Sequence, residues 1–553
     1  MDENNRKILT AQEAEKISQE VLINSREALV SFLIEIFDID TGLEVDVNEL
    51  KRNNSFRVLY ELLVDIPCIT IAIEHKYVDR VYRDSYYMHY ACKHQSYDRY
   101  CKRISLFNGN IISNGSIYEA DPELLQKEFI GAVSIRPIAE RKIGRSLINP
   151  YFVTEKGNTY VRFAKYNITI SGVRLYVNAF PYSMQDCETT TCAEITILNL
   201  LDYYSQRYSE YRYLLPSDIA EIAEKNGFER SLPSKGLGYQ VITKVFSEAG
   251  FYPKLYKVEA LREVSQFKRI LHYYIESGIP VAIGVKNDDE TRHSVVCMGH
   301  GKINYNNIDK KIYAIYAADT NEYIWLIDSA DLSSNYIVMD DGQKPYAECE
   351  WKEYRGESGF SPEIFKFGNY EPDTLMVPLY RRMFLEAQDA YDISTTVLTS
   401  SIFGIKRVMS DIGSRQNPVI IRLFMASARG FKKGRIGSFS RKNGEISARY
   451  RNVLFPRFVW VCELYTKEGY NSNQAMGEIV IDATASPYDG INSILIVHYP
   501  FNIVYRHLYT EDMDQKASAE KTFEQISSWE SFKGYSNLSI PDLFSKEIHN
   551  ECD

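Results

Sequence analysis

Apolar residues in this chain are gathered in segments about the length of a β-strand. One of the longest, SILIVHYPF from Ser493 to Phe501, is far shorter than the roughly 20 apolar residues that a membrane-spanning helix needs. The N-terminal stretch, MDENNRKILTAQEAEKISQEVL, has no apolar core of the kind found in signal peptides. We therefore expect a soluble cytoplasmic protein, built from strands and amphipathic helices, with no membrane partner.

The length of the chain predicts several hydrophobic cores. At about 150 residues per domain, 553 residues correspond to three or four domains. Hydrophobic residues make up 45% and charged residues 25%, which is typical of globular proteins and excludes a disordered chain. The nine cysteines are sparse and odd in number, which argues against a disulfide framework and indicates reduced thiols in the cytosol.

Changes in the pattern divide the chain into three units, at residues 1–165, 166–378 and 379–553. The first unit is α+β, with a helical pattern from Ala11 to Phe37. The apolar residues of that pattern are spaced for one buried face: Leu29, Phe32, Leu33 and Ile36. Strand-like segments follow in the same unit: Cys68–Ile73, Phe129–Ile135 and Tyr160–Phe163.

The second unit begins with a strand-like stretch from Ile168 to Ala179, continues with helical patterns to about Glu276, and ends with several strands. The third unit is predicted to be a β-rich domain. Its strand-like segments are Val419–Phe424, Phe458–Val461, Gly477–Asp482 and Ser493–Val497.

The segment Pro181–Tyr204, PYSMQDCETTTCAEITILNLLDYY, is the most informative for chemistry. Thr191-Cys192-Ala193-Glu194 has the form of a capping box ahead of an apolar run, which predicts Cys192 as the first helical residue. The helix dipole and the unpaired N–H groups of a helix start stabilise a thiolate, and such cysteines can have pKa values of about 3.5–7.5. Cys192 is the candidate nucleophile; the alternative is a small buried residue, as most free cysteines are.

A cysteine nucleophile needs a base, and the base needs an acceptor that orients it. His293 stands where a polar turn enters a strand, a position that can direct its ring into a cleft. A later strand ends in Asp340 and Asp341, so the chain order of Cys192, His293 and Asp340 is nucleophile, base and orienter. His300 is the alternative base, although it follows its strand instead of opening it.

Gln185 lies seven residues before Cys192. Its side-chain amide could donate to a developing oxyanion together with the Cys192 backbone N–H. Cys187 is a second thiol in the same turn, but it lies outside the predicted helix and is interpreted as a neighbour of the nucleophile.

Residues of about 170 to 350 resemble the papain-like fold in the form seen in bacteriocin leader-processing peptidases and their stand-alone relatives. The first match is the segment with Gln185, Cys192 and the helix that follows. The other matches are KGLGYQ (Lys235–Gln240) with VFSEAGFYPKLY (Val245–Tyr256), GIPVAIGV (Gly278–Val285) followed by HSVVCMGHG (His293–Gly301), and YIVMDD (Tyr336–Asp341). The resemblance implies an α+β protein with a papain-like central domain between two α+β domains.

Residue by residue, the resemblance implies Gln185 for the oxyanion hole, Cys192 as nucleophile, His293 as base and Asp340 as orienter. Asp341 is the alternative orienter. Two positions depart from the family. Ala193 follows the cysteine where the family has Gly or Gly-Pro, and the spacing from glutamine to cysteine is one residue longer than usual.

The implied activity is that of a bacterial cytoplasmic cysteine peptidase, a thiol hydrolase that cleaves a peptide or isopeptide bond in a protein or peptide substrate without a cofactor. Two alternatives remain. One is an enzyme of the acyltransferase type, and the other is a non-catalytic papain-like scaffold that binds a partner through its flanking domains.

Three further patterns contain potential metal ligands or clustered basic residues. His89, Cys92, His94 and Cys101 lack the paired spacing of a structural zinc site, and a tyrosine-rich structural segment is the preferred interpretation. The basic residues of Arg136–Arg145 are expected in a solvated loop, with an anion site as the alternative. The basic run Arg429–Arg451 predicts a flexible hairpin or loop that could bind nucleic acid or an acidic partner. It is the one candidate surface for nucleic acid, since the net charge of −10 argues against nucleic-acid binding elsewhere.

Overall fold

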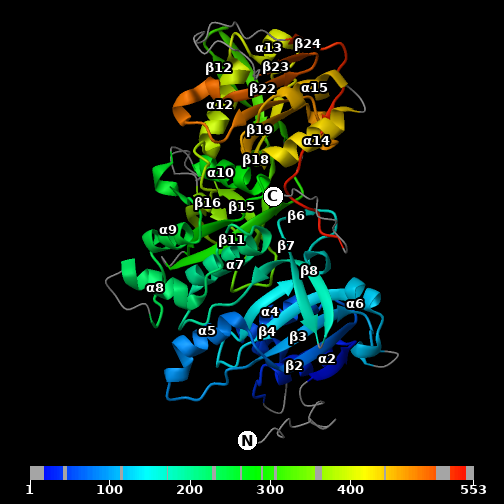
Figure 1. Cartoon of the computed structure of the whole chain (residues 1–553), viewed down its shortest axis with the longest axis vertical. Coiled ribbons are helices and arrows are strands. Elements are labelled where there is room, and N and C mark those ends of the chain that lie inside the picture. The colour runs from blue at the N-terminus through cyan, green and yellow to red at the C-terminus, as the bar shows by residue number, and fades with distance from the viewer. Residues whose placement is uncertain are drawn as a thin grey trace, which may run out of the picture.

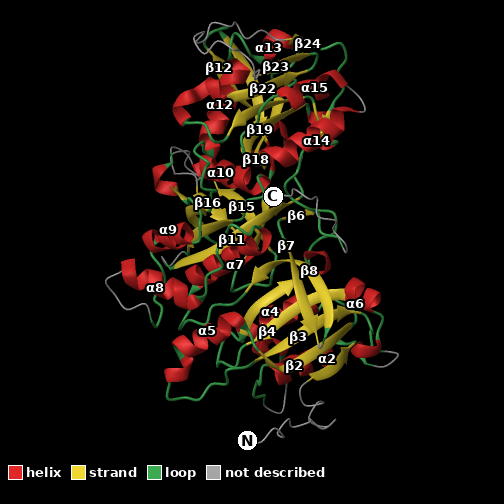
Figure 2. Cartoon of the chain, viewed as in Figure 1, coloured by secondary structure: helices red, strands yellow, loops and turns green. Residues whose placement is uncertain are grey.

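Helices and strands contribute in similar amounts, so the predicted α+β class is confirmed. The computed structural model describes residues 18–41, 46–112, 116–170, 172–226, 232–261, 264–287, 291–303, 308–354, 364–440, 444–505 and 524–542. Three large sheets follow one another along the long axis of the molecule (Figures 1 and 2). None of the described helices combines the length and the apolar character needed to cross a bilayer.

The first sheet is antiparallel, with the order β1-β2-β3-β4-β5-β8-β7. Its strands are β1 (Ser18–Ile23), β2 (Ile69–Tyr77), β3 (Cys101–Asn108), β4 (Phe129–Ile135), β5 (Ile143–Ile148), β7 (Ala164–Ile170) and β8 (Val173–Tyr182). The helices of this part are α2 (Arg26–Ile36), α3 (Val47–Leu50), α4 (Asn54–Leu63), α5 (Arg80–Met88) and α6 (Pro122–Glu128). The predicted buried face of α2 is confirmed: Leu29, Phe32, Leu33 and Ile36 are its buried residues.

The second sheet, also antiparallel, has the order β16-β15-β14-β11-β10-β17-β9, and the short strand β6 (Thr159–Val161) adds to β11. Its strands are β9 (Lys254–Lys257), β10 (Val281–Lys286), β11 (Arg292–Gly301), β14 (Asn335–Met339), β15 (Ala347–Tyr354), β16 (Ile364–Phe367) and β17 (Glu371–Val377). Four helices precede β10 in this part of the chain: α7 (Cys192–Arg207), α8 (Pro216–Asn226), α9 (Tyr239–Glu248) and α10 (Val264–Glu276). Helix α7 packs against β11 of this sheet and against β7 and β8 of the first.

The third sheet has the order β12-β13-β18-β19-β21-β22-β23-β24, in which only β13 and β18 are parallel. Its strands are β12 (Tyr313–Ala317), β13 (Glu322–Asp328), β18 (Val419–Ser427), β19 (Phe458–Tyr465), β21 (Gly477–Asp482), β22 (Ile494–Tyr499), β23 (Asn502–Tyr505) and β24 (Glu524–Gln525). A small separate pair joins β20 (Gln474–Ala475) to β25 (Phe532–Lys533). The helices here are α11 (Ser329–Leu332), α12 (Ala387–Thr399), α13 (Ile405–Val408), α14 (Ala428–Ser440), α15 (Gly444–Asn452) and α16 (Lys467–Asn471).

Strands pair across both predicted unit boundaries. Strand β7 begins at Ala164 and β8 follows it, yet both belong to the first sheet, whereas β6 precedes them and joins the second. Strands β12 and β13 precede residue 378 and join the third sheet. The last described segment returns to the second sheet, where Ser539 and Val161 exchange two backbone hydrogen bonds of 2.9 and 3.0 Å. The three sheets are therefore interleaved along the chain.

Three local predictions are wrong. Residues 18–23, expected within a helix from Ala11 to Phe37, form β1, because this segment pairs with β2 along its whole length; residues 11–17 lie outside the described part of the chain. The single strand expected from Ile168 to Ala179 is the β7–β8 hairpin. The basic run Arg429–Arg451 forms helices α14 and α15 instead of a flexible loop; Arg441 and Lys442 fall outside the described residues.

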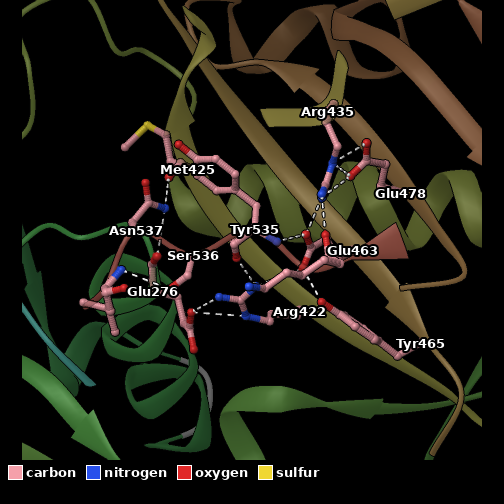
Figure 3. Close-up of polar contacts among 12 residues, drawn as sticks. Glu276, Arg422, Met425, Arg435, Glu463, Tyr465, Glu478, Tyr535, Ser536 and Asn537 are labelled. Atoms are coloured by element: carbon pink, nitrogen blue, oxygen red, sulfur yellow. Dashed lines mark hydrogen bonds and ion pairs between the residues drawn. The ribbon is translucent and has the colours of Figure 1, made fainter. Parts of the chain in front are cut away.

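A buried network of charges includes Arg435 from the basic run (Figure 3). Arg422 on β18, Glu463 on β19 and Glu478 on β21 are successive cross-strand partners, so two carboxylates stand side by side. The buried Arg435 of α14 donates to both Glu463 and Glu478. Like charges placed directly opposite destabilise a sheet, and the Arg435 guanidinium offsets that repulsion.

The same network joins the third sheet to α10. Arg422 donates to Glu276 of α10 at 2.5 Å and to Glu463 at 2.9 Å. The last described segment covers these groups: the Tyr535 N–H donates to Glu463 at 2.7 Å, and the Asn537 amide donates to the backbone carbonyls of Glu276 and Met425 (Figure 3). This segment therefore fastens the second and third sheets to each other.

Candidate active site

Cys192 is the first residue of α7, as predicted. Thr191 is the N-cap, with extended backbone angles (φ −104°, ψ −174°), and the capping box with Glu194 is present. The Thr191 backbone N–H donates to the Glu194 carboxylate at 3.1 Å. The Cys192 side chain is partly exposed, so its sulfur lies at a helix start and is accessible.

The turn before the helix is built around Asp186. One oxygen of its carboxylate accepts the backbone N–H groups of Glu188, Thr189 and Thr190, at 2.8 to 3.0 Å. Burial alone would raise the pKa of Asp186, but the nearby Arg136 and these hydrogen bonds lower it below its ordinary value. An aspartate that accepts from the backbone of the following residues is a known turn signal, so Asp186 was visible in the sequence but not predicted to have this role.

His293 is the second residue of β11, beside the end of β14. Its Nε2 lies 2.9 Å from Asp340 Oδ1 and 3.5 Å from Asp341 Oδ1. Asp340 Oδ1 also accepts the Gly342 N–H at 2.9 Å, which fixes the carboxylate. The Tyr370 ring lies beside the imidazole, with centroids 5.7 Å apart. The structure thus brings His293, Asp340 and Asp341 together.

The Cys192 side chain is also next to the imidazole of His293 and interacts with it. Because Nε2 faces Asp340, Nδ1 is the nitrogen left for the sulfur. Burial lowers the pKa of His293, but the hydrogen bond with Asp340, the interaction with Cys192 and the charges of Asp340 and Asp341 outweigh it and raise the pKa to about 10. An imidazolium beside a thiol favours the thiolate, the reactive form of cysteine.

The raised pKa of His293 makes a prediction about stability. The folded value of about 10 exceeds the ordinary 6.5, so the contribution of His293 to the free energy of unfolding is complete below about pH 6.5 and is lost as the pH rises toward 10. Urea unfolding of Cys192→Ala and of Cys192→Ala/His293→Gln should therefore give a difference that shrinks over this range. The alanine removes thiol ionisation from both proteins. A difference that does not change with pH would contradict the pairing of His293 with the two carboxylates.

Cys192 and His293 line a cleft of about 570 Å³ between α7, α9, β10 and β17. Gln185 lines the same cleft, so three of the four predicted site residues border it. The fourth, Asp340, contacts one of them, His293. The remaining walls are mostly apolar or small, including Ile197, Ile242 and Gly284. The cleft is open at one side and large enough for an extended chain segment.

One wall of the cleft is the loop that leads into α9. The Ser234 hydroxyl donates to the Glu194 carboxylate, and its backbone N–H donates to the Glu188 carbonyl at 2.8 Å. These bonds fasten the loop to the start of α7 and to the Asp186 turn. The wall residues Lys235 to Tyr239 are thereby held over Cys192.

The alternatives to these residues lie elsewhere. His300 is buried, with Nε2 at 3.1 Å from Glu276, and does not line the cleft. Cys187 is exposed as a whole residue and has a left-handed backbone (φ 61°). Its thiol is partly desolvated by neighbouring groups, which raises its pKa. His89, in the tyrosine-rich segment, contacts Glu188 at 2.7 Å, and this contact supports the Asp186 turn.

Residues 136–142 form the loop between β4 and β5, as predicted, but the expectation that the basic residues of Arg136–Arg145 are solvated is wrong. Arg136 is buried and donates to the carbonyls of Arg141 and Met184, at 2.5 and 3.0 Å. Arg145 pairs with Asp202 of α7 at 2.6 Å. These cations hold the first sheet against the elements that carry the site.

Within the described ranges, one group of three potential metal ligands was found, and it is His293, Asp340 and Asp341. All three already contact one another as an imidazole with two carboxylates. Compared with known proteins, the sequence matches no protein-family model and no curated protein sequence.

Proposed function

We propose that this chain is a papain-like thiol hydrolase that cleaves a peptide or isopeptide bond through Cys192, His293 and Asp340. The observation that carries the proposal is the arrangement around one imidazole at the cleft: a carboxylate binds its Nε2, and a helix-start thiol that lines the same cleft interacts with the ring. Each group is held by its own local structure. A nucleophile, a base and an orienter within hydrogen-bond reach are the signature of covalent acyl transfer.

The reaction proceeds in two steps. The Cys192 thiolate attacks the substrate carbonyl, and the carbonyl π electrons move to oxygen. The oxyanion is held by the Cys192 backbone N–H and the Gln185 side chain. The His293 imidazolium then gives the Nδ1 proton to the leaving amine as the carbon–nitrogen bond breaks and a thioester forms.

Water completes the cycle. His293, now neutral, takes a proton from a water molecule that attacks the thioester, and the carboxylic acid leaves as the thiolate is restored. Asp340 holds the imidazole in one tautomer and stabilises its charged form throughout. Its hydrogen bond with the Gly342 N–H keeps the carboxylate in place during both steps.

The cleft supports an extended peptide as substrate. It is open along one side, and the walls near Cys192 combine small residues, such as Gly236 and Gly284, with apolar ones. Small lining residues leave room for the backbone of a peptide beside Cys192. We propose a cytoplasmic protein or peptide as the substrate.

Alkylation tests the proposal directly. Iodoacetamide at neutral pH should modify Cys192 at least about 10-fold faster than Cys92 or Cys187, because a thiolate reacts and a thiol does not. Cys92 is the strict comparison, since Cys92 is exposed and Cys192 is only partly exposed. The rates are read by peptide mass spectrometry, and in urea the three cysteines should react alike. If Cys192 is not the fastest in the folded protein, the chain is a non-catalytic scaffold.

A further inference from the structure

Asp341 contacts two residues of the candidate site, Gln185 and His293. Its Oδ2 accepts the Gln185 backbone N–H at 3.3 Å, and its Oδ1 is 3.5 Å from His293 Nε2. The residue is only 5% exposed, and Oδ1 has no hydrogen bond to any described residue. A buried carboxylate is costly unless a cation compensates it, so its contacts with His293 and with nearby cations keep it in this position.

Arg141, in the loop between β4 and β5, is the second cation at Asp341. Its Nη1 lies 3.8 Å from Asp341 Oδ2. The Arg141 backbone is left-handed (φ 51°), which is uncommon for a residue with a side chain. Arg136 binds the Arg141 carbonyl and the Met184 carbonyl with the same guanidinium, so the loop and the residue before Gln185 are fixed to each other.

Gln185 lies three residues after the end of β8, a strand of the first sheet. The last β5–β8 pair is Ser146 with Tyr182, and the Met184 N–H then donates to the Ile143 carbonyl at 3.1 Å. His293 belongs to the second sheet. The oxyanion residue and the base are thus carried by different sheets, and the Asp341 carboxylate is in contact with both.

We propose that Asp341 and Arg141 form a positioning element of the active site, through which the first sheet fixes Gln185 relative to His293. The inference rests on the proposed function and adds a role for the N-terminal part of the chain. Donors for an oxyanion must be placed within about 0.5 Å, and an error of about 1 Å can cost about 100-fold in rate. A carboxylate that touches both the base and the Gln185 turn provides that placement.

The test compares two reagents on the full chain. p-Nitrophenyl acetate acylates a thiol through an oxyanion, whereas iodoacetamide alkylates it without one. Asp341→Asn should lower acylation by about 10- to 100-fold and alkylation by less than about threefold. Arg141→Gln should give the same pattern with a smaller loss. Arg141→Lys should restore the acylation rate, because lysine keeps the positive charge that lies 3.8 Å from Asp341 in the wild type. Arg174→Gln, an exposed arginine on β8, is the matched control and should react like the wild type.

A second measurement reports on His293 without catalysis. Carbon-13 NMR of labelled histidine, with the His293 signal identified by its loss in His293→Gln, should show a lower titration midpoint in Asp341→Asn than in the wild type, because this change removes a negative charge beside the imidazolium. A purely structural role would leave this midpoint in place. Far-ultraviolet circular dichroism checks that each variant is folded.

The outcomes separate the two hypotheses. If acylation in Asp341→Asn and Arg141→Gln and the His293 midpoint in Asp341→Asn all equal those of the wild type, the positioning role is wrong. If acylation survives unchanged in Cys192→Ala, the proposed function is wrong, and the His293 midpoint alone then decides: a lower midpoint in Asp341→Asn supports the contact of Asp341 with His293, and an unchanged one overturns it.

Discussion

Cys192→Ala is expected to abolish covalent acylation of the protein by p-nitrophenyl acetate, and His293→Gln to slow it by about 10³-fold or more. Alanine removes the sulfur on which the active-site thioester would form. Glutamine removes the group that holds the thiolate and later gives up a proton, while keeping a polar side chain beside Asp340. The burst of p-nitrophenolate gives the rate, and intact-protein mass spectrometry counts the acyl groups.

Gln185→Ala provides the internal control for this experiment. Loss of one oxyanion donor should lower the acylation rate by about 10²- to 10³-fold while leaving alkylation by iodoacetamide within about threefold of the wild type. Equal acylation of wild type and Gln185→Ala would remove Gln185 from the oxyanion hole. Equal acylation of wild type, Cys192→Ala and His293→Gln would remove the nucleophile and the base together.

The elements that present the site could be predicted because their signals are local. A capping box fixed the start of α7 at Cys192, and the strand boundaries placed His293 and Asp340 where turns meet strands. Each of these signals spans fewer than about ten residues. The convergence of the three side chains in one cleft was expected from the resemblance and from chain order, not from any distance in the sequence.

The residues that the sequence analysis missed act through long-range contacts. Arg141 was interpreted as part of a solvated loop, yet it approaches Asp341, which lies 200 residues further along the chain. Arg435 was assigned to a flexible loop, since nothing near it in the sequence shows that Glu463 and Glu478 stand together in a sheet. Burial of a cation depends on partners that only the fold brings near.

Glu463→Ala is expected to lower the free energy of unfolding by about 3–5 kcal/mol, the typical cost of leaving buried charges without their partner. Glu463 is fully buried and accepts from Arg422, Arg435, the Tyr465 hydroxyl and the Tyr535 backbone. Its removal leaves the guanidinium groups of Arg422 and Arg435 with one carboxylate each, Glu276 and Glu478. Burial raises the pKa of Glu478, so that carboxylate is the weaker of the two partners.

The Glu210–Arg457 pair is the matched control, because it also joins the chain after α7 to the third sheet but lies in solvent. Its side chains are 43% and 55% exposed, and their closest atoms are 2.9 Å apart. Glu210→Ala should therefore cost only about 0–1 kcal/mol. Urea unfolding followed by the fluorescence of the buried Trp460, on β19 beside this network, measures both variants. Since both glutamates have an arginine at 2.9 Å or less, equal losses would mean that burial of Glu463 adds nothing and that the three-strand network does not stabilise the third sheet.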